Sequence, residues 1–231
     1  MTRDEQARVD LHTHSFLSDG ALLPAEMLRR AEALGYGVLA ITDHADASNL
    51  DEVAGQLARF FREGAPAFGV TFIPGVELTH VRPAQIAPLA RRARRLGARL
   101  VVVHGETPVE PVWPGTNRAA VECPDVDILA HPGLITEEEA ALAAAHGVVL
   151  ELSGRSGHCL TNGHVAHVAR LTGARLVVNS DTHTPGDMLD QARARLVALG
   201  AGLTGEEARA ALVTNAWNLA SKALRPPMQS I

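Results

Sequence analysis

The stretch Val9-Asp10-Leu11-His12-Thr13-His14 joins a short apolar run to two histidines that are one residue apart. Similar runs recur along the chain, each rich in β-branched residues or Leu and largely apolar on both faces. They cover residues 9–11, 38–42, 70–73, 100–103, 126–130, 148–152 and 176–178. Runs of this kind are typical of parallel strands that are buried beneath helices.

Segments of helical character separate these runs. The first begins with Pro24 at the first helical position and ends at Gly35, which are common helix start and stop signals. The predicted helices cover residues 24–34, 51–63, 83–96, 137–146, 163–171 and 185–199, and two terminal helices follow within residues 204–224. Seven strands that alternate with helices predict a (β/α) barrel or a closely related layered α/β fold.

No shift in composition marks a second domain, so we expect one domain over residues 1–231. One connection, residues 105–125, contains four prolines and is too long for an ordinary linker. Connections of that length in compact domains are usually functional or contain a small helix. Residues 225–231 are expected to form a short frayed tail.

Composition excludes several classes of protein. The formal charge of −5 disfavours a protein that mainly coats nucleic acid, because binding phosphates requires a basic surface. The N-terminus has no apolar signal-peptide region, and no stretch approaches the roughly 18 apolar residues of a membrane span. The sequence therefore predicts a cytoplasmic protein with no membrane partner.

Histidine and acidic residues follow six of the seven apolar runs. In a parallel barrel the carboxyl ends of the strands share one rim, so these side chains should converge there. Residues i and i+2 of an extended strand face the same side, and the pairs that have this spacing suit one metal ion. Imidazole and carboxylate bind Zn, Mn and Fe. The residues are His12, His14, Asp43, His44, Glu77, His104, His131, Asp181 and His183.

The same residues resemble the motifs of the PHP (polymerase and histidinol phosphatase) family. In order, these are Asp10-Leu11-His12-Thr13-His14-Ser15 with Ser18-Asp19-Gly20, Thr42-Asp43-His44, Gly75-Val76-Glu77, His104, Ala130-His131-Pro132 and Ser180-Asp181-Thr182-His183. The resemblance spans about residues 9–185 and implies a distorted (β/α)7 barrel with two or three divalent ions (Zn, Mn or Fe).

The resemblance also implies how the ligands are shared. His12, His14, Glu77 and Asp181 would hold one ion. Glu77 would bridge to a second ion held by His104 and His131. A third ion would be held by Asp19, His44 and His183, so that all nine positions carry competent ligands.

A cluster of this kind favours phosphate chemistry. Three divalent ions would exceed the charge of the three carboxylates by about three, which attracts a phosphate dianion. A metal-activated hydroxide can attack phosphorus while the ions neutralise its oxygens. Together with the resemblance, this predicts a hydrolase acting on phosphoric ester bonds, with a small phosphorylated metabolite (a histidinol-phosphate-like monoester) as its substrate.

Residues that contact the substrate are less constrained by the sequence. Arg155 and His158 follow the run at 148–152, where Arg155 could clamp phosphate oxygens and His158 could protonate the leaving group. A solvated loop is the competing interpretation for both. Glu151 could orient a metal-bound histidine or simply face the barrel interior. His80 is a weaker candidate for substrate contact.

Three alternatives remain open. An amidohydrolase barrel also begins with two histidines, but its common binuclear form needs a bridging lysine, and Lys222 is the only lysine here. A PHP-type nuclease would share the chemistry and act on DNA or RNA, for which residues 91–99 offer five arginines. A ribonuclease P subunit-like barrel would bind RNA without catalysis and need not retain metal ligands.

Overall fold

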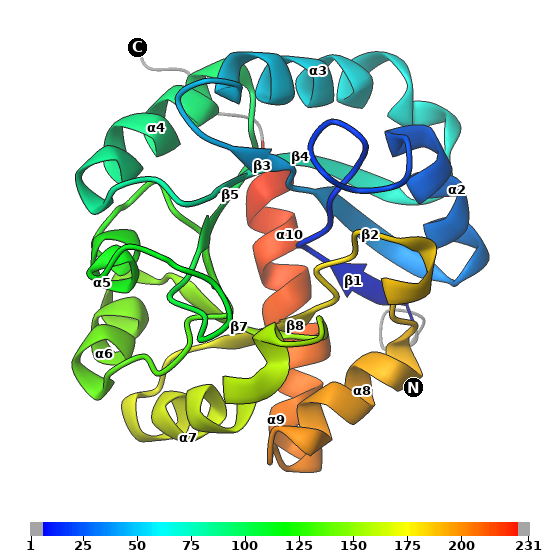
Figure 1. The fold of residues 1–231 in the computed structure, drawn as a ribbon. Helices are drawn as coiled ribbons and strands as arrows, with labels where there is room; N and C mark the ends of the chain where they lie inside the picture. The colour runs from blue at the N-terminus through cyan, green and yellow to red at the C-terminus, as the bar shows by residue number, and fades with distance from the viewer. Residues whose placement is uncertain (1–6, 226–231) are drawn as a thin grey trace.

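Seven parallel strands wind into an almost closed barrel in the computed structural model, which describes residues 7–225 (Figure 1). In sheet order they are β1 (Arg8–Asp10), β2 (Tyr36–Ile41), β4 (Thr71–Leu78), β5 (Leu100–His104), β6 (Ile128–Ala130), β7 (Val149–Ser153) and β8 (Leu176–Asn179). A short strand, β3 (His44–Ala45), pairs with the end of β4. The predicted barrel is confirmed. Of the tail expected at residues 225–231, residues 226–231 lie outside the described residues.

Helices surround the strands (Figure 1). They are α2 (Pro24–Ala33), α3 (Leu50–Glu63), α4 (Pro83–Leu96), α5 (Thr116–Val121), α6 (Glu137–His146), α7 (Asn162–Thr172), α8 (Gln191–Gly200), α9 (Gly205–Arg209) and α10 (Ala216–Leu224), with the π-helical η4 (Ala210–Asn215) joining the last two. Single 3-10 turns form η1 (Ala65–Ala67), η2 (His158–Thr161) and η3 (Pro185–Asp187). None of the helices in the described residues is long and apolar enough to cross a membrane.

The helix predicted over residues 185–199 begins later than expected. The Asp190 side chain accepts a hydrogen bond from the backbone N–H of Arg193 and caps α8 at Gln191. Pro185 instead opens the separate turn η3, which Thr184 and Asp187 cap reciprocally. The proline signal marked the start of a turn rather than the start of the long helix.

Strand β4 is longer than predicted and includes Glu77. Its first half, Thr71 to Pro74, pairs with β2, and its second half, Gly75 to Leu78, pairs with β5. A side chain at Gly75 would place its Cβ 2.7 Å from Thr42 Cγ2 and 2.9 Å from the Leu100 carbonyl oxygen. Glycine at this position therefore lets the strand pass close to its neighbours and carry Glu77 into the barrel.

Alternating side chains divide the apolar residues into two cores. On β5, Leu100 and Val102 face the barrel interior, whereas Val101 and Val103 pack beneath the outer helices. The interior core is closed by α10, which crosses the centre of the view in Figure 1 and packs Leu219 and Ala220 against the strand residues. Because the strand repeat is two residues, the next inward position on β5 is His104. The apolar interior thus leads directly to the polar rim.

Side chains help to join β1 to β8. The Asn179 side chain accepts a hydrogen bond from the Leu11 N–H, and Asp10 accepts one from the Ser180 N–H, at 3.0 and 3.1 Å. Arg8 is fully buried, lies 3.2 Å from Asp10 Oδ2 and donates to the Val178 carbonyl. This β1–β8 seam places the ligand pair that follows β1 beside the pair that follows β8.

Candidate metal centre

The four residues predicted to hold the first ion meet at the rim of the barrel. His12 Nε2 and His14 Nε2 face each other at 3.0 Å. Glu77 Oε1 lies 3.4 Å from His12 Nε2, and Asp181 Oδ1 lies 3.3 Å from His14 Nε2. All four side chains are buried. Two imidazoles and two carboxylates therefore direct their donor atoms at one another.

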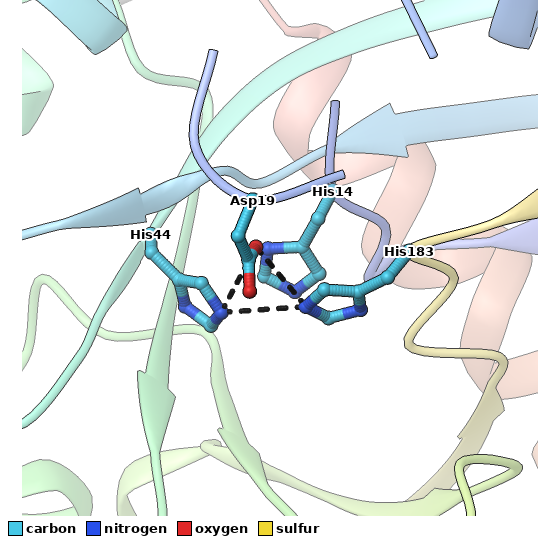
Figure 2. A group of neighbouring side chains, drawn as sticks. All are labelled: His14, Asp19, His44 and His183. Carbon is cyan, nitrogen blue, oxygen red and sulfur yellow. Dashed lines mark hydrogen bonds and ion pairs between the residues drawn. The ribbon is translucent and has the colours of Figure 1, made fainter. Parts of the chain in front are cut away.

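The residues predicted to hold the third ion also lie together (Figure 2). Asp19 Oδ1 is 3.5 Å from His44 Nε2 and 3.2 Å from His183 Nε2, and the two imidazole nitrogens are 3.4 Å apart. His14 lies behind them, with its ring centroid 4.1 Å from both of the other rings. His14 therefore lies between the two groups of donors.

Asp43 holds the loop that carries Asp19. Its carboxylate accepts hydrogen bonds from the Ser15 N–H and hydroxyl, each at 2.7 Å, and from the Ser18 hydroxyl at 2.6 Å. Gly20 completes the turn, because a Cβ there would lie 2.2 Å from the His14 carbonyl oxygen. Asp43, which follows a predicted strand, thus positions a donor and belongs to none of the candidate metal-binding groups of the described residues.

Glu77 contacts residues of both groups of donors, and its surroundings indicate whether divalent ions fit the site. Its Oε2 lies 2.7 Å from His44 Nδ1 in an ion pair, and its Oε1 lies 3.6 Å from His131 Nε2. Among the described residues, Oε1 is buried and has no hydrogen-bond partner. A buried carboxylate oxygen without a donor is costly unless a cation satisfies it. The donor set and this oxygen both fit divalent ions.

Glu151 orients His12. Its Oε2 lies 2.7 Å from His12 Nδ1 and accepts a second hydrogen bond from the Asn179 side chain at 2.8 Å. Since a carboxylate only accepts, His12 Nδ1 carries a proton, and Nε2 is the nitrogen that faces Glu77. Glu151 is therefore buried in the barrel and contacts His12, while its role toward a metal-bound histidine stays a prediction.

Burial and neighbouring charges shift the pKa values of the buried donors in opposite directions. Burial lowers the pKa of His14 well below its usual value, and the adjacent His44 lowers it further. Burial disfavours the charged forms of His12 and Glu77. In each case the neighbouring groups of opposite charge outweigh burial, so the pKa of His12 is raised and that of Glu77 is lowered. For Asp181, burial dominates and raises the pKa to about 7.

His104 and His131 have neighbours that the sequence did not predict. Their ring nitrogens approach those of His158 closely enough for all three to hold one ion, whereas Glu77 approaches His131 but is not grouped with His104. His104 Nε2 instead lies 3.1 Å from Glu110 Oε2, and His158 Nε2 lies 3.2 Å from Glu110 Oε1. Burial, reinforced by His131 and His104, lowers the pKa of His158 to about 3.

Glu110 is the residue that sequence reasoning missed. It lies alone between Val109 and Pro111, on a connection with no strand or helix period to single it out. The one available signal was the unusual length of residues 105–125, which also contains α5. The hydrogen bond with His104 outweighs burial and lowers the pKa of Glu110 well below its usual value.

A pocket of about 430 Å³ opens above the donors and is lined by Asp19, His44, His104, His131, Asp181 and His183. Arg155 and His158 line it as well. Arg155 is partly exposed, with Nη1 2.6 Å from His183 Nδ1 and Nε 4.0 Å from Asp181 Oδ2. A guanidinium therefore stands directly beside the carboxylate and imidazole donors.

Comparison with known proteins explains the motif order. The PHP domain model matches residues 10–226. The chain belongs to the PHP domain family. The resemblance drawn from the sequence motifs is thus confirmed, and the seven-stranded barrel is the fold on which these motifs meet.

Two relatives illustrate the range of similarity. An uncharacterized protein of Methanocaldococcus jannaschii is 47% identical over 202 residues, covering 87% of this chain and 92% of the relative. A 3',5'-nucleoside bisphosphate phosphatase of Chromobacterium violaceum is 42% identical over 73 residues, which cover 32% of this chain and 23% of that enzyme. The second match therefore concerns a small part of a longer protein.

Two solved structures share the fold. A chain from archaeal ribonuclease P with mature tRNA superposes with a TM-score of 0.70 at 16% identity and covers 96% of both chains. Histidinol phosphate phosphatase of Lactococcus lactis, complexed with zinc, L-histidinol and phosphate, gives a TM-score of 0.55 at 17% identity, over 85% of this chain and 94% of that one. At such identities these similarities concern the fold alone.

Proposed function

We propose that this protein is a metal-dependent phosphoesterase that hydrolyses a small phosphomonoester. The observation that carries the proposal is the convergence of buried imidazole and carboxylate donors beneath one pocket that an arginine also lines. A pocket of about 430 Å³ has the size of a metabolite site. The bisphosphate phosphatase among the relatives acts on a substrate of the same chemical class, which supports the proposal.

The donors described above would hold two or three divalent ions, with Zn, Mn and Fe all suited to these ligands. Such ions, when bound, polarise phosphoryl oxygens and lower the pKa of water. The chain itself fixes the donors: Glu151 orients His12, Glu77 orients His44, and Asp43 holds the loop of Asp19. These contacts hold the donor atoms in place before the substrate arrives, which is what electrostatic catalysis requires.

Arg155 is proposed to bind the substrate phosphate. Its guanidinium lines the pocket, and its planar set of donors matches two phosphate oxygens at once. His183 and Asp181 hold it against the rim, so little side-chain freedom would be lost on binding. Its place beside the donors would orient the ester with its phosphorus toward them.

His158 fits the role of a donor ligand better than that of an acid. With a pKa of about 3 its ring is neutral at pH 7 and holds no additional proton to release to a leaving group. The reason is burial, together with the neighbouring His131 and His104, which lower the pKa of His158 more than Glu110 raises it. The proposal therefore assigns protonation of the leaving group to solvent in the open pocket.

Nucleic acid is the less favoured substrate. Three of the four arginines of α4 are matched by acidic side chains: Arg92 donates to Asp51 at 2.8 Å, and Arg94 pairs with Asp127. Arg91 lies 3.8 Å from Asp125. Because these charges are largely compensated, they offer little attraction for a phosphate backbone. The same argument weakens an RNA-binding role without catalysis.

Metal-free protein should be reconstituted with Mn²⁺ or Zn²⁺ and assayed for phosphate release from a panel of phosphorylated metabolites. We expect hydrolysis of at least one monoester, and its loss in His14→Ala. A matched control is His167→Ala, which alters an exposed histidine of α7. Shortening of single-stranded oligonucleotides without release of phosphate from any monoester would overturn the monoester assignment in favour of a nuclease.

A further inference from the structure

Two side chains outside the nine predicted donors, Glu110 and His158, lie against two of those donors and give the cluster the composition of a metal site. His104, His131 and His158 approach one another closely enough to hold one ion, and Glu110 forms a second such group with His104 and His80. His104 and His131 approach each other with ring centroids 4.5 Å apart, and His131 and His158 do so at 4.1 Å. Three imidazoles and one carboxylate form a ligand set that suits Zn²⁺, Mn²⁺ or Fe²⁺.

Both carboxylate oxygens of Glu110 face imidazole nitrogens. Oε1 lies 3.2 Å from His158 Nε2, while Oε2 lies 3.1 Å from His104 Nε2 and 3.1 Å from His80 Nε2. His104 and His158 are almost fully buried, and His158 Nδ1 has no hydrogen-bond partner among the described residues. The Glu110 carboxylate thus faces the imidazoles of His80, His104 and His158, and a cation would complete this arrangement.

The loop that carries Glu110 is tied down at its base. The backbone N–H of Glu106 donates to the Asn117 side chain at 3.0 Å, and the Asn117 N–H donates to the Glu106 carboxylate at 2.9 Å. The Asn117 amide also donates to the Pro132 carbonyl at 2.8 Å, next to His131. These bonds fix the base of the loop that carries Glu110 to the connection that follows β6.

A second attachment joins the loop to the connection after β4. The Arg82 guanidinium lies 4.7 Å from the centroid of the Trp113 ring, in a cation–π contact.

His80, two residues before Arg82, contacts Glu110 and has a positive φ of 53°, which a non-glycine residue adopts at some cost. His131 and Asp181 share this unusual backbone with φ values of 28° and 54°. The strained position turns His80 toward the loop.

We propose that His104, His131, His158 and Glu110 together hold a divalent cation, so that a carboxylate of the long loop ligates the second ion of the centre. The inference deepens the proposed function, because the site lies in the same pocket, and it adds two ligands to those that the sequence motifs supply. His80 acts as a positioning residue, since its Nε2 lies 3.1 Å from Glu110 Oε2, the oxygen that also faces His104.

Cobalt binding tests this assignment without any substrate. Metal-free wild-type protein, Glu110→Gln and His158→Ala should be titrated with Co²⁺, with the visible absorption following ligation and a competing chelator giving the affinity of each ion. We expect each variant to lose one ion per chain or to bind it at least about tenfold more weakly, a loss at least as large as that caused by removing a residue that supports a ligand. The remaining ions should bind as in the wild type.

Glu122→Gln is the matched control, because Glu122 is an exposed carboxylate at the end of α5 that pairs with Arg118. Unfolding temperatures of the metal-free variants separate lost ligation from lost folding, and Glu110→Gln preserves the shape of the side chain. Wild-type stoichiometry and affinity in Glu110→Gln would overturn the role of the loop carboxylate, and the same result in His158→Ala would overturn that of His158.

This outcome is distinguishable from failure of the proposed function. Loss of one Co²⁺ ion in the variants, with no ester hydrolysed by the wild type, would sustain the metal site and overturn the phosphoesterase. Hydrolysis by the wild type, with unchanged Co²⁺ binding in the variants, would overturn the metal site and sustain the phosphoesterase.

Discussion

The two sides of the pocket hold their donors in different ways. On one side, His12, His14 and Asp181 lie at or just beyond strand ends, are buried, and are fixed by neighbours such as Glu151 and by the β1–β8 seam. On the other side, Glu110 lies in the long loop and His158 begins the turn η2 in the connection after β7, and the Glu110 side chain is 36% exposed. We call these the strand side and the loop side.

The difference shows which part of a site a fold determines. A parallel barrel brings the ends of its strands to one rim, so strand-side donors are preorganised wherever the strands form. Loop-side donors depend on particular contacts, such as the bonds between Glu106 and Asn117. Substitutions on the strand side should therefore affect the whole centre, whereas those on the loop side should affect one ion or one step.

The largest effect is expected for Glu77→Gln. Glu77 contacts His12, His131 and His44, so the change replaces a shared charged oxygen with a neutral amide. Removing a residue that only supports a ligand costs about 10–100-fold in metal affinity, and we expect a loss greater than about 100-fold here. Chelator competition should measure it. Wild-type affinity would show that the strand side does not share Glu77.

The next effect concerns the seam that supports the strand side. Asp10→Asn removes the charge that compensates the fully buried Arg8. Loss of one partner of a buried ion pair typically costs about 3–5 kcal/mol, and urea unfolding of the metal-free protein should show a loss of this size. The exposed pair of Arg118 and Glu122 is the control, because Glu122→Gln should cost less than about 1 kcal/mol. Equal effects would mean that the seam contributes no more than a surface contact.

Arg155→Lys should impair substrate binding and leave the metal centre intact. Lysine keeps the charge but loses the planar pair of donors. Hydrogen bonds to charged groups contribute about 1.5–3 kcal/mol, so kcat/KM should fall by roughly 10–100-fold, mainly through a higher KM. Steady-state kinetics on the best monoester, with metal content measured in parallel, provides the check. Loss of bound ions, or an unchanged KM, would contradict a role in phosphate binding.

The pH dependence of metal binding should differ between the two sides. The pKa of His12 is raised and that of Asp181 is raised to about 7, so protons compete with ions on the strand side as the pH falls. The pKa values of Glu110 and His158 are lowered, so these residues are already deprotonated at pH 6. Between pH 8 and pH 6, affinity should fall by roughly tenfold or more on the strand side, and by less on the loop side.

Calorimetric titration of metal-free protein at pH 6, 7 and 8 measures this difference. Glu110→Gln, which should lack the loop-side ion, allows the strand-side ions to be followed alone. An affinity on the strand side that stays constant over this range would contradict the assignment of protonated His12 and Asp181 in the metal-free protein.

The smallest effect is expected for His80→Ala. His80 is 42% exposed and contacts Glu110 through one nitrogen, and exposed ion pairs contribute about 0.2–1 kcal/mol. Co²⁺ should bind the loop side up to about fivefold more weakly, with the strand side unchanged. His167→Ala again serves as the control. A complete loss of the loop-side ion would make His80 a ligand in its own right.

Much of the strand side could be predicted from the sequence. The apolar runs located all seven barrel strands, and the spacing of His12 and His14 indicated donors that face one ion. Glu77 was expected to follow its strand but lies within it, because Gly75 lets β4 continue past Pro74. The error was small because an inward position within β4 reaches the same rim.

The loop side could not be predicted in the same way. Glu110 has no periodic neighbours, and its position depends on hydrogen bonds between residues about ten positions apart in the loop. His158 was visible as a residue after a strand, but only the fold brings its ring beside His131. The start of α8 was missed for a similar reason, since Asp190 and Pro185 both offer start signals and the structure uses each for a different element.

The most direct test of the account is the metal content of wild-type protein purified without chelator and measured by elemental analysis. We predict two or three divalent ions per chain, with Glu77→Gln retaining fewer than the wild type. Less than one ion per wild-type chain, also after incubation with excess Mn²⁺ or Zn²⁺, would contradict a metal centre at the rim of the barrel.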